Sequence, residues 1–197
     1  MAVRVVIAED EAIIRLDLRE ILQEQGYEVV GETGRGDEAV TLVREHKPDL
    51  AILDIRMPGM DGLAAARVIT ADDEAAVLIL TAFSQRNLIE EARDAGALAY
   101  LIKPFTQAEL VPAIEVALGR FREMQAIKAT NASLEEQLET RKLVDRAKGL
   151  LMDNHGMKEA EAFDLIQKTA MRERRKMKEV AQDVIDQKVV PPAAPNS

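Results

Sequence analysis

The first 119 residues of the chain contain several short apolar runs, most of which end abruptly in polar residues. Residues 3–8, 50–53, 77–80 and 100–102 are such runs, and residues 27–31 form a weaker one. Continuous apolar runs of this length are typical of strands buried on both faces of a parallel sheet. Between them, apolar residues recur at helical spacing, as Ile14, Leu18 and Leu22 do. The pattern predicts five strand–helix repeats and therefore a doubly wound α/β domain.

A different pattern follows this domain. No helix-breaking signal appears from Ala117 to about residue 153, so we expect one long helix. Within it, apolar residues alternate at spacings of three and four around a central Asn131, which makes a short heptad seam of Met124, Ile127, Asn131, Leu134 and Leu138. Two interpretations stay open, a structural helix packed within the chain and a dimeric coiled coil.

Residues 143–188 show three helical segments, with breaks near residues 154–156 and 174–175. Three short amphipathic helices predict a small helical bundle, with Phe163 in its core. Residues 189–197 are rich in proline, and we expect them to be disordered. The expected organisation is a domain over residues 1–119, a helical or coiled-coil linker over 120–142, a helical domain over 143–188 and a tail over 189–197.

Composition narrows the class of protein. The net charge is −9 and there is no cysteine, which excludes disulfides and thiolate metal sites. No apolar run approaches the ~18–20 residues that cross a bilayer, and no signal peptide precedes the first strand, so we expect a cytoplasmic protein without membrane contact. The acidic side chains are concentrated in residues 1–119, whereas basic residues outnumber acidic ones over 141–178. Only the second segment could attract a polyanion.

Chemistry-bearing residues follow four of the predicted strands. Glu9 and Asp10 come after the first run and Asp54 after the third, while Thr81 and Lys103 come after the last two. Because the carboxyl ends of parallel strands meet at one edge, these side chains should share a crevice. Carboxylates there suit Mg²⁺, and a lysine and a hydroxyl could contact phosphoryl oxygens. Phosphoryl transfer needs chiefly such positioning and charge neutralisation.

These residues, with Tyr100 and the Lys103-Pro104 pair, resemble the receiver domain of two-component response regulators. The resemblance implies a flavodoxin-like fold with a parallel 2-1-3-4-5 sheet and no enzymatic role. It implies that a sensor histidine kinase phosphorylates Asp54, that Mg²⁺ is the cofactor, and that Thr81 and Tyr100 carry the switch. It further implies a cis Lys103–Pro104 bond, and a metal site formed by Glu9 (through water), Asp10, Asp54 and the carbonyl of Arg56.

The segment containing Asp145-Arg146-Ala147-Lys148-Gly149, Glu161-Ala162-Phe163 and Ala170-Met171 is similar to the ANTAR domain, an RNA-binding antitermination module. The resemblance implies an antiterminator that binds stem-loop RNA and could form a homodimer on phosphorylation. Candidate RNA contacts are basic, namely Arg146, Lys148, Arg172, Arg174, Arg175 and Lys176. Two alternatives stay open. One is a DNA-binding transcription regulator, and the other is a coiled-coil interaction protein without nucleic acid.

Overall fold

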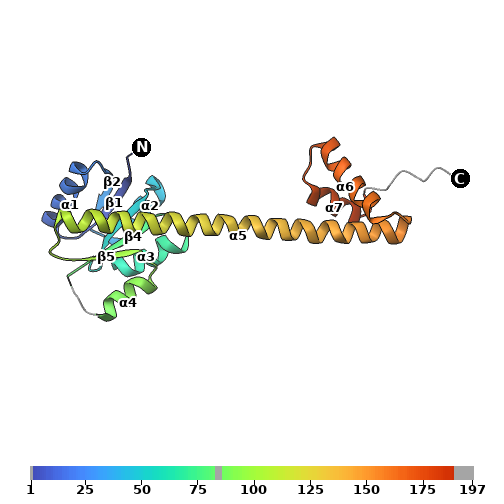
Figure 1. Ribbon diagram of the computed structural model, residues 1–197. Helices are drawn as coiled ribbons and strands as arrows, with labels where there is room; N and C mark the ends of the chain where they lie inside the picture. Colours follow the sequence, from blue (N-terminus) through green and yellow to red (C-terminus); the bar gives the residue numbers. More distant parts are fainter. Residues whose placement is uncertain (1, 83–85, 189–197) are drawn as a thin grey trace. The chain divides into compact units, whose positions relative to one another are not determined.

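The computed structural model describes residues 2–82 and 86–188, and the chain divides into two compact units, Met1–Gln125 and Ala126–Ser197 (Figure 1). The first unit contains five parallel strands in the order β2-β1-β3-β4-β5. The strands are β1 (Arg4–Ala8), β2 (Glu28–Thr33), β3 (Leu50–Asp54), β4 (Ala76–Thr81) and β5 (Ala99–Ile102). The helices between them are α1 (Ala12–Glu24), α2 (Gly36–His46), α3 (Gly62–Ala71) and α4 (Arg86–Asp94).

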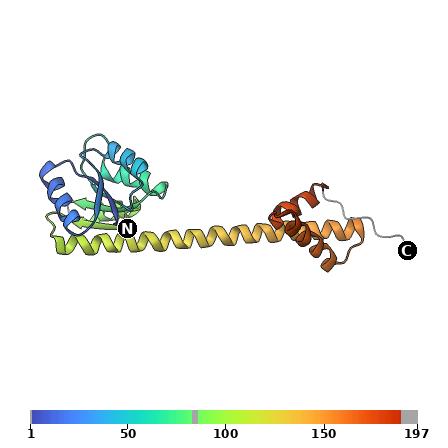
Figure 2. The same ribbon diagram turned by 90° about the horizontal axis from the view of Figure 1, so that it is seen from above.

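Helices cover both faces of this sheet, as Figure 2 shows from above. On one face, α2, α3 and α4 bury small and branched side chains against alternate residues of the central strands. On the other face, α1 and the start of α5 (Gln107–His155) do the same with the remaining alternate residues. Every residue of β3 and β4 is buried, which explains why these two strands read as uninterrupted apolar runs.

The long helix α5 begins after Thr106, whose backbone N–H and hydroxyl both donate to the Glu109 carboxylate, at 2.8 and 2.9 Å. It continues to His155, so the predicted unbroken helix is confirmed (Figure 1). Gly156, with φ +65°, follows its end. Two further helices complete the second unit, α6 (Glu159–Glu173) and α7 (Met177–Ile185). The turn between them places Arg174 at φ +53°.

The core of the second unit is aliphatic. It is made by the last turns of α5 together with one face of α6 and of α7, through Val144, Ala147, Leu151, Ala162, Ile166, Ala170, Val180, Ala181 and Val184. Phe163 is not part of it, because 40% of the residue is exposed. The expectation of a core phenylalanine was therefore wrong. Phe163 lies at the edge of the buried stripe of α6, next to Ala162, so its ring is partly in solvent.

The predicted fold is confirmed in its sheet order, its long helix and its following helices. The Lys103–Pro104 peptide bond is cis. None of the described helices is long and apolar enough to span a bilayer. The domain boundaries at residues 119, 142 and 188 stay predictions, and the tail at 189–197 lies outside the described residues.

Candidate functional site

Three carboxylates meet at the carboxyl edge of the sheet. Glu9 follows β1 directly, Asp10 comes next, and Asp54 is the last residue of β3. One oxygen from each lies within 4.8 Å of the others. Glu9 is 0% and Asp54 5% exposed, whereas Asp10 is exposed to solvent. The predicted convergence of these residues is therefore observed in the structure.

Lys103 joins this cluster from the residue after β5. Its Nζ lies 2.5 Å from Glu9 Oε2 and 2.9 Å from Asp54 Oδ1, so a single ammonium is shared by two buried carboxylates. The backbone N–H of Lys103 donates to Thr81 O at 2.7 Å, which fixes the loop beside the end of β4. Thr81 itself is 3% exposed at that strand end.

Burial dominates the electrostatics of this cluster. Desolvation raises the pKa of the Glu9 carboxyl above its ordinary value, and nearby Asp54 adds to the rise while Lys103 opposes it. Desolvation alone would lower the pKa of Lys103, but its hydrogen bonds to Glu9 and Asp54 outweigh this effect and raise the pKa. The lysine therefore stays an ammonium at neutral pH.

Backbone groups hold the acidic side chains in place. The Arg56 N–H donates to Asp54 Oδ2 at 3.0 Å, and the Glu11 N–H donates to Glu9 Oε1 at 3.3 Å. The N–H of Glu9 donates to Thr33 O at 3.0 Å, which ties the residue to β2. Beside the cluster, a pocket of 540 Å³ is lined by Asp10 and Arg56 among others, so the cluster borders an open cleft.

Sequence reasoning missed one neighbour of the site. Arg15, on the first turns of α1, donates from Nη1 to the carbonyl oxygen of Glu9. The sequence holds no signal for this contact, because an arginine on an exposed helix turn usually points to solvent. The guanidinium nevertheless adds a second cation beside the carboxylates.

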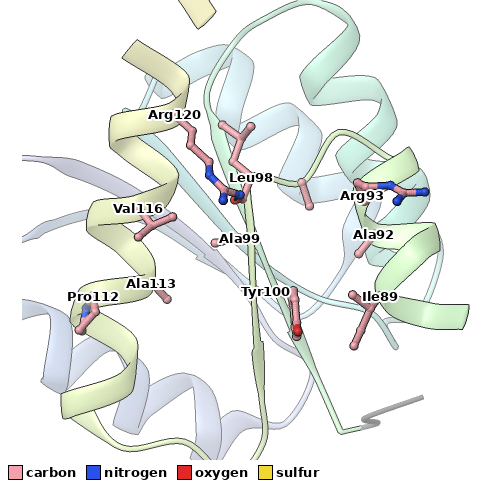
Figure 3. A pocket seen from close by; sticks show the side chains of 11 residues that line it. Ile89, Ala92, Arg93, Leu98, Ala99, Tyr100, Pro112, Ala113, Val116 and Arg120 are labelled. Carbon is pink, nitrogen blue, oxygen red and sulfur yellow. Dashed lines mark hydrogen bonds between the residues drawn. The ribbon is translucent and has the colours of Figure 1, made fainter. Parts of the chain in front are cut away.

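Tyr100 lies elsewhere. It is 43% exposed on β5 and lines a largely apolar pocket of 460 Å³ between α4, β5 and α5, together with Ile89 and Val116 (Figure 3). Arg120 lies at the rim of this pocket, where its Nη1 donates to Leu98 O at 2.9 Å (Figure 3). The residue expected to act in the switch with Thr81 therefore faces a pocket that the carboxylates do not line.

The predicted RNA contacts fall into two groups. Four of the six cations are engaged inside the second unit. Lys148 Nζ lies 2.8 Å from both Asp145 and Glu159, and Lys176 Nζ lies 3.0 Å from Glu136. Arg172 and Arg175 each lie 3.2 Å from Glu173.

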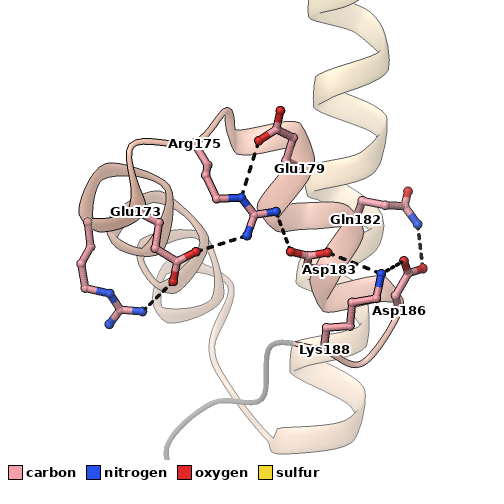
Figure 4. Close-up of polar contacts among 8 residues, drawn as sticks. Glu173, Arg175, Glu179, Gln182, Asp183, Asp186 and Lys188 are labelled. Carbon is pink, nitrogen blue, oxygen red and sulfur yellow. Dashed lines mark hydrogen bonds and ion pairs between the residues drawn. The ribbon is translucent and has the colours of Figure 1, made fainter.

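Arg175 is the most heavily engaged of these cations. Its guanidinium also lies 2.6 Å from Asp183 and 3.6 Å from Glu179, so it joins the end of α6 to α7 (Figure 4). The hydrogen bonds that Arg175 donates to Asp183 and Glu173 raise its pKa further above the ordinary value. By contrast, Arg146 and Arg174 are exposed and form no ion pair with any residue that the structure describes.

Comparisons with known proteins agree with this geometry. Residues 5–115 match the response regulator receiver domain, and residues 132–185 match the ANTAR domain. The chain is 58% identical over 183 residues to the transcriptional regulatory protein PdtaR of Mycobacterium tuberculosis, which covers 93% of this chain and 89% of that protein.

Solved structures resemble the first unit. A DNA-binding response regulator of the LuxR family from Staphylococcus aureus is 31% identical with a TM-score of 0.56, over 59% of this chain and 98% of that one. The receiver domain of sensor histidine kinase PA1611 from Pseudomonas aeruginosa PAO1, solved with magnesium in its active site cleft, is 28% identical with a TM-score of 0.55, over 60% of this chain and 99% of that one. The chain therefore belongs to the response regulators in which a receiver domain is followed by an ANTAR domain.

Proposed function

We propose that this protein is a phosphorylation switch that acts on RNA as a transcription antiterminator, with Asp54 as the phosphoacceptor. The observation that carries the proposal is the position of Asp54. It is a nearly buried carboxylate at the end of a central strand, with an ammonium 2.9 Å from one oxygen and a backbone N–H 3.0 Å from the other. A phosphoryl group arriving there meets fixed positive groups, which is what phosphoryl transfer requires.

The donor set fits Mg²⁺. Glu9, Asp10 and Asp54 supply hard oxygen ligands within 4.8 Å of one another, and Asp10 has no ion-pair partner among the described residues. Within residues 2–82 and 86–188, Lys103 is the one ammonium that pairs with the two buried members, so the cluster keeps an excess of negative charge. Glu9, Asp10, Asp54 and the Arg56 carbonyl would hold the ion. When bound, Mg²⁺ would neutralise charge on the incoming phosphoryl group.

The remaining residues of the crevice have separate roles in this proposal. Lys103 exchanges its contact with Asp54 for one with a phosphoryl oxygen, since its ammonium already lies at the carboxylate. Thr81, at the end of the neighbouring strand, donates its hydroxyl to another phosphoryl oxygen. Tyr100 responds from the α4–β5–α5 pocket, and together these changes constitute the switch.

A sensor histidine kinase is the proposed phosphodonor. The surface next to the crevice favours a protein partner, because α1 starts two residues after Asp10 and carries Ile13, which is 77% exposed, and Leu16, which is 43% exposed. Large apolar side chains on a helix beside a reactive carboxylate are suited to docking a protein that delivers phosphate.

The output is proposed to be RNA bound by the second unit. Arg146 and Arg174 are exposed and have no ion-pair partner among the described residues, so they can contact phosphates without losing an internal ion pair. Phosphorylation of Asp54 adds about −1.5 to −2 charges, enough to bias a two-state element. A homodimer formed through the α5 seam would bring two helical units to one transcript.

A second candidate is supported by one observation. The seam residues Ile127, Leu134 and Leu138 are 61%, 57% and 53% exposed, so the described chain does not cover them. Coiled-coil pairing alone, with a protein rather than RNA as the target, would also use this seam.

Two measurements test the proposal. The full chain is treated with Mg²⁺ and a small-molecule phosphodonor, and then titrated with stem-loop RNA. We expect a mass increase of one phosphoryl group and tighter RNA binding in the wild type and in Asp72→Asn, a control that removes an exposed carboxylate paired with Arg44. Asp54→Asn should show neither effect.

Different failures have different meanings. RNA binding that strengthens equally in Asp54→Asn would refute Asp54 as the acceptor that controls the output. Phosphorylation with dimerisation but no RNA binding would favour the coiled-coil interaction protein. Steep weakening of binding with salt would support phosphate contacts, because each neutralised phosphate releases counterions.

A further inference from the structure

The three carboxylates of the crevice are not held in the same way. Those of Glu9 and Asp54 each contact the Lys103 ammonium and one backbone N–H. The carboxylate of Asp10 has neither kind of contact with any residue that the structure describes, and it is the exposed member of the three. The direction of the Asp10 side chain therefore depends on how the backbone before it is fixed.

The backbone that leads into Asp10 is held on both sides of Glu9. The N–H of Glu9 donates to Thr33 O at 3.0 Å, which ties this residue to β2. Its carbonyl oxygen, which belongs to the peptide group shared with Asp10, accepts a hydrogen bond from Nη1 of Arg15. Because a peptide group is planar, a fixed carbonyl also fixes the N–H and the Cα of the next residue. Arg15 therefore orients the backbone of Asp10.

The turn between β2 and α2 leaves room for this arginine. A Cβ at Gly34 would lie 3.3 Å from Arg15 Nη1 and 3.5 Å from the Asp10 Cα. A side chain there would press on the guanidinium and on the residue that it orients. Glycine at this position thus lets the guanidinium lie close to the Glu9 carbonyl.

The guanidinium contacts a carbonyl rather than a carboxylate. Arg15 is half-buried and forms no ion pair within the part of the chain that the structure describes, although Asp10 directly follows the carbonyl that it contacts. An ion pair between Arg15 and Asp10 would occupy lone pairs of the carboxylate and compete with a metal cation. The contact with the carbonyl leaves both Asp10 oxygens available as ligands.

We propose that Arg15 is a positioning residue of the Mg²⁺ site, which holds the Glu9–Asp10 peptide so that the Asp10 carboxylate faces the ion. Residues that orient metal ligands without touching the metal typically contribute about 10- to 100-fold to metal affinity. The positive charge of Arg15 alone would weaken the binding of a cation, so charge and orientation act in opposite directions. In this proposal orientation dominates. The inference rests on the metal site proposed above and adds the residue that prepares its exposed ligand.

The experiment measures the Mg²⁺ affinity of the full chain by calorimetry. It also measures the Mg²⁺ concentration that gives half the maximal rate of phosphorylation by a small-molecule phosphodonor. Arg15→Met removes the charge and the donor but keeps a long side chain, whereas Arg15→Lys keeps the charge in a compact ammonium. The matched control is Arg19→Met, because Arg19 lies one turn later on α1 and pairs with Glu32 at 3.1 Å. Urea unfolding is recorded for every variant.

We expect Arg15→Met to weaken Mg²⁺ binding by about 10-fold and to raise the half-maximal Mg²⁺ concentration by the same factor. The phosphorylation rate at saturating Mg²⁺ should stay unchanged, because the bound ion then fixes the Asp10 carboxylate. Arg15→Lys should lie between the wild type and Arg15→Met, and Arg19→Met should match the wild type. A purely structural role of Arg15 would lower the urea midpoint without this change in metal dependence.

Each contrary result has a definite meaning. If the wild type does not bind Mg²⁺, the proposed metal site fails and this inference falls with it. If the wild type binds Mg²⁺ and Arg15→Met binds it equally or more tightly, Arg15 does not position Asp10. Equal weakening in Arg19→Met, or a lower rate of Arg15→Met at saturating Mg²⁺, would also overturn the inference. If Arg15→Met does not fold, Arg15→Lys decides alone, and wild-type affinity in that variant would overturn the inference.

Discussion

Two glycines in the first unit allow the packing around Asp54 to be tested by the same substitution in two settings. Gly62, the first residue of α3, lies against the backbone of Asp54, the proposed phosphoacceptor. A Cβ at Gly62 would stand 1.9 Å from Asp54 O and 2.8 Å from Asp54 C. Gly119, within α5, has nothing within 4 Å of its Cβ position. Both positions are helical, so the intrinsic helix preference favours alanine at each.

The two substitutions should change the free energy of unfolding in opposite directions. Gly119→Ala should stabilise the first unit by about 0.5–1 kcal/mol, because alanine loses less backbone entropy than glycine in a helix. Gly62→Ala gains at most a similar amount, but backbone atoms must move to admit the methyl group. Such overpacking costs about 1–3 kcal/mol, so we expect a net loss of about 1–2 kcal/mol.

The assay can follow the first unit alone. The chain has no tryptophan, and its two tyrosines, Tyr27 and Tyr100, both lie in Met1–Gln125. Urea unfolding followed by tyrosine fluorescence therefore reports this unit, and the difference in midpoint at constant slope gives the difference in free energy of unfolding. Calorimetric titration with Mg²⁺ adds the functional readout. Gly62→Ala should bind the ion more weakly than the wild type, and Gly119→Ala should bind it equally.

One result would refute this reasoning. If Gly62→Ala unfolds at the same urea concentration as Gly119→Ala, the turn between β3 and α3 relaxes at little cost. The close approach of Gly62 to the Asp54 carbonyl would then not be what fixes the position of Asp54.

Three further predictions concern separate parts of the chain. Burial raises the pKa of Tyr27 from 10.0 to about 12, helped by its hydrogen bond to Glu115 Oε1 at 3.0 Å. Below pH 10 Tyr27 is protonated in the folded and in the unfolded state, so the stability that it adds relative to Tyr27→Phe should be constant. Between pH 10 and 12 this difference in free energy of unfolding should decline by up to about 2.7 kcal/mol. A difference that does not change with pH in urea unfolding would contradict this. Ile13→Ala should slow phosphorylation by the histidine kinase several-fold and leave phosphorylation by a small-molecule donor unchanged, and equal slowing with both donors would exclude a docking role. Leu134→Lys should abolish any phosphorylation-induced dimer seen by light scattering without lowering the melting temperature, whereas a fall in melting temperature would show that Leu134 packs within one chain.

Much of the first unit followed from the sequence because its signals are local. Strands β3 and β4 are buried on both faces, so their sequences are apolar runs. Parallel pairing of these strands then brings Asp54 and Thr81 to the same edge of the sheet. The contacts that were missed are long-range or depend on backbone approach. Arg15 donates to the Glu9 carbonyl and Gly62 lies against the Asp54 carbonyl. An arginine or a glycine in the sequence does not by itself predict such a contact.

The second unit was less predictable because its surface is decided by tertiary pairing. Lys176 pairs with Glu136, forty positions earlier in the chain, and Arg175 with Asp183 on the next helix. A count of basic residues cannot distinguish these engaged cations from Arg146 and Arg174, which form no ion pair within the described part of the chain. Phe163 was misplaced for a related reason, since helical spacing puts it beside Ala162 and Leu165 but does not say which side of that stripe meets a neighbouring helix.

The composition of the α5 seam argues that pairing of two chains would be conditional rather than permanent. Its apolar positions are only Met124, Ile127, Leu134 and Leu138, and the position at its centre is Asn131. A buried Asn in such a seam fixes the register of two helices but reduces the stability of the pair. With a seam this short, the equilibrium between separate and paired chains should therefore have a constant that favours neither state strongly. A modest bias from the phosphorylated receiver would then suffice to shift it, whereas a longer, fully apolar seam would pair regardless of Asp54 and could not report its state.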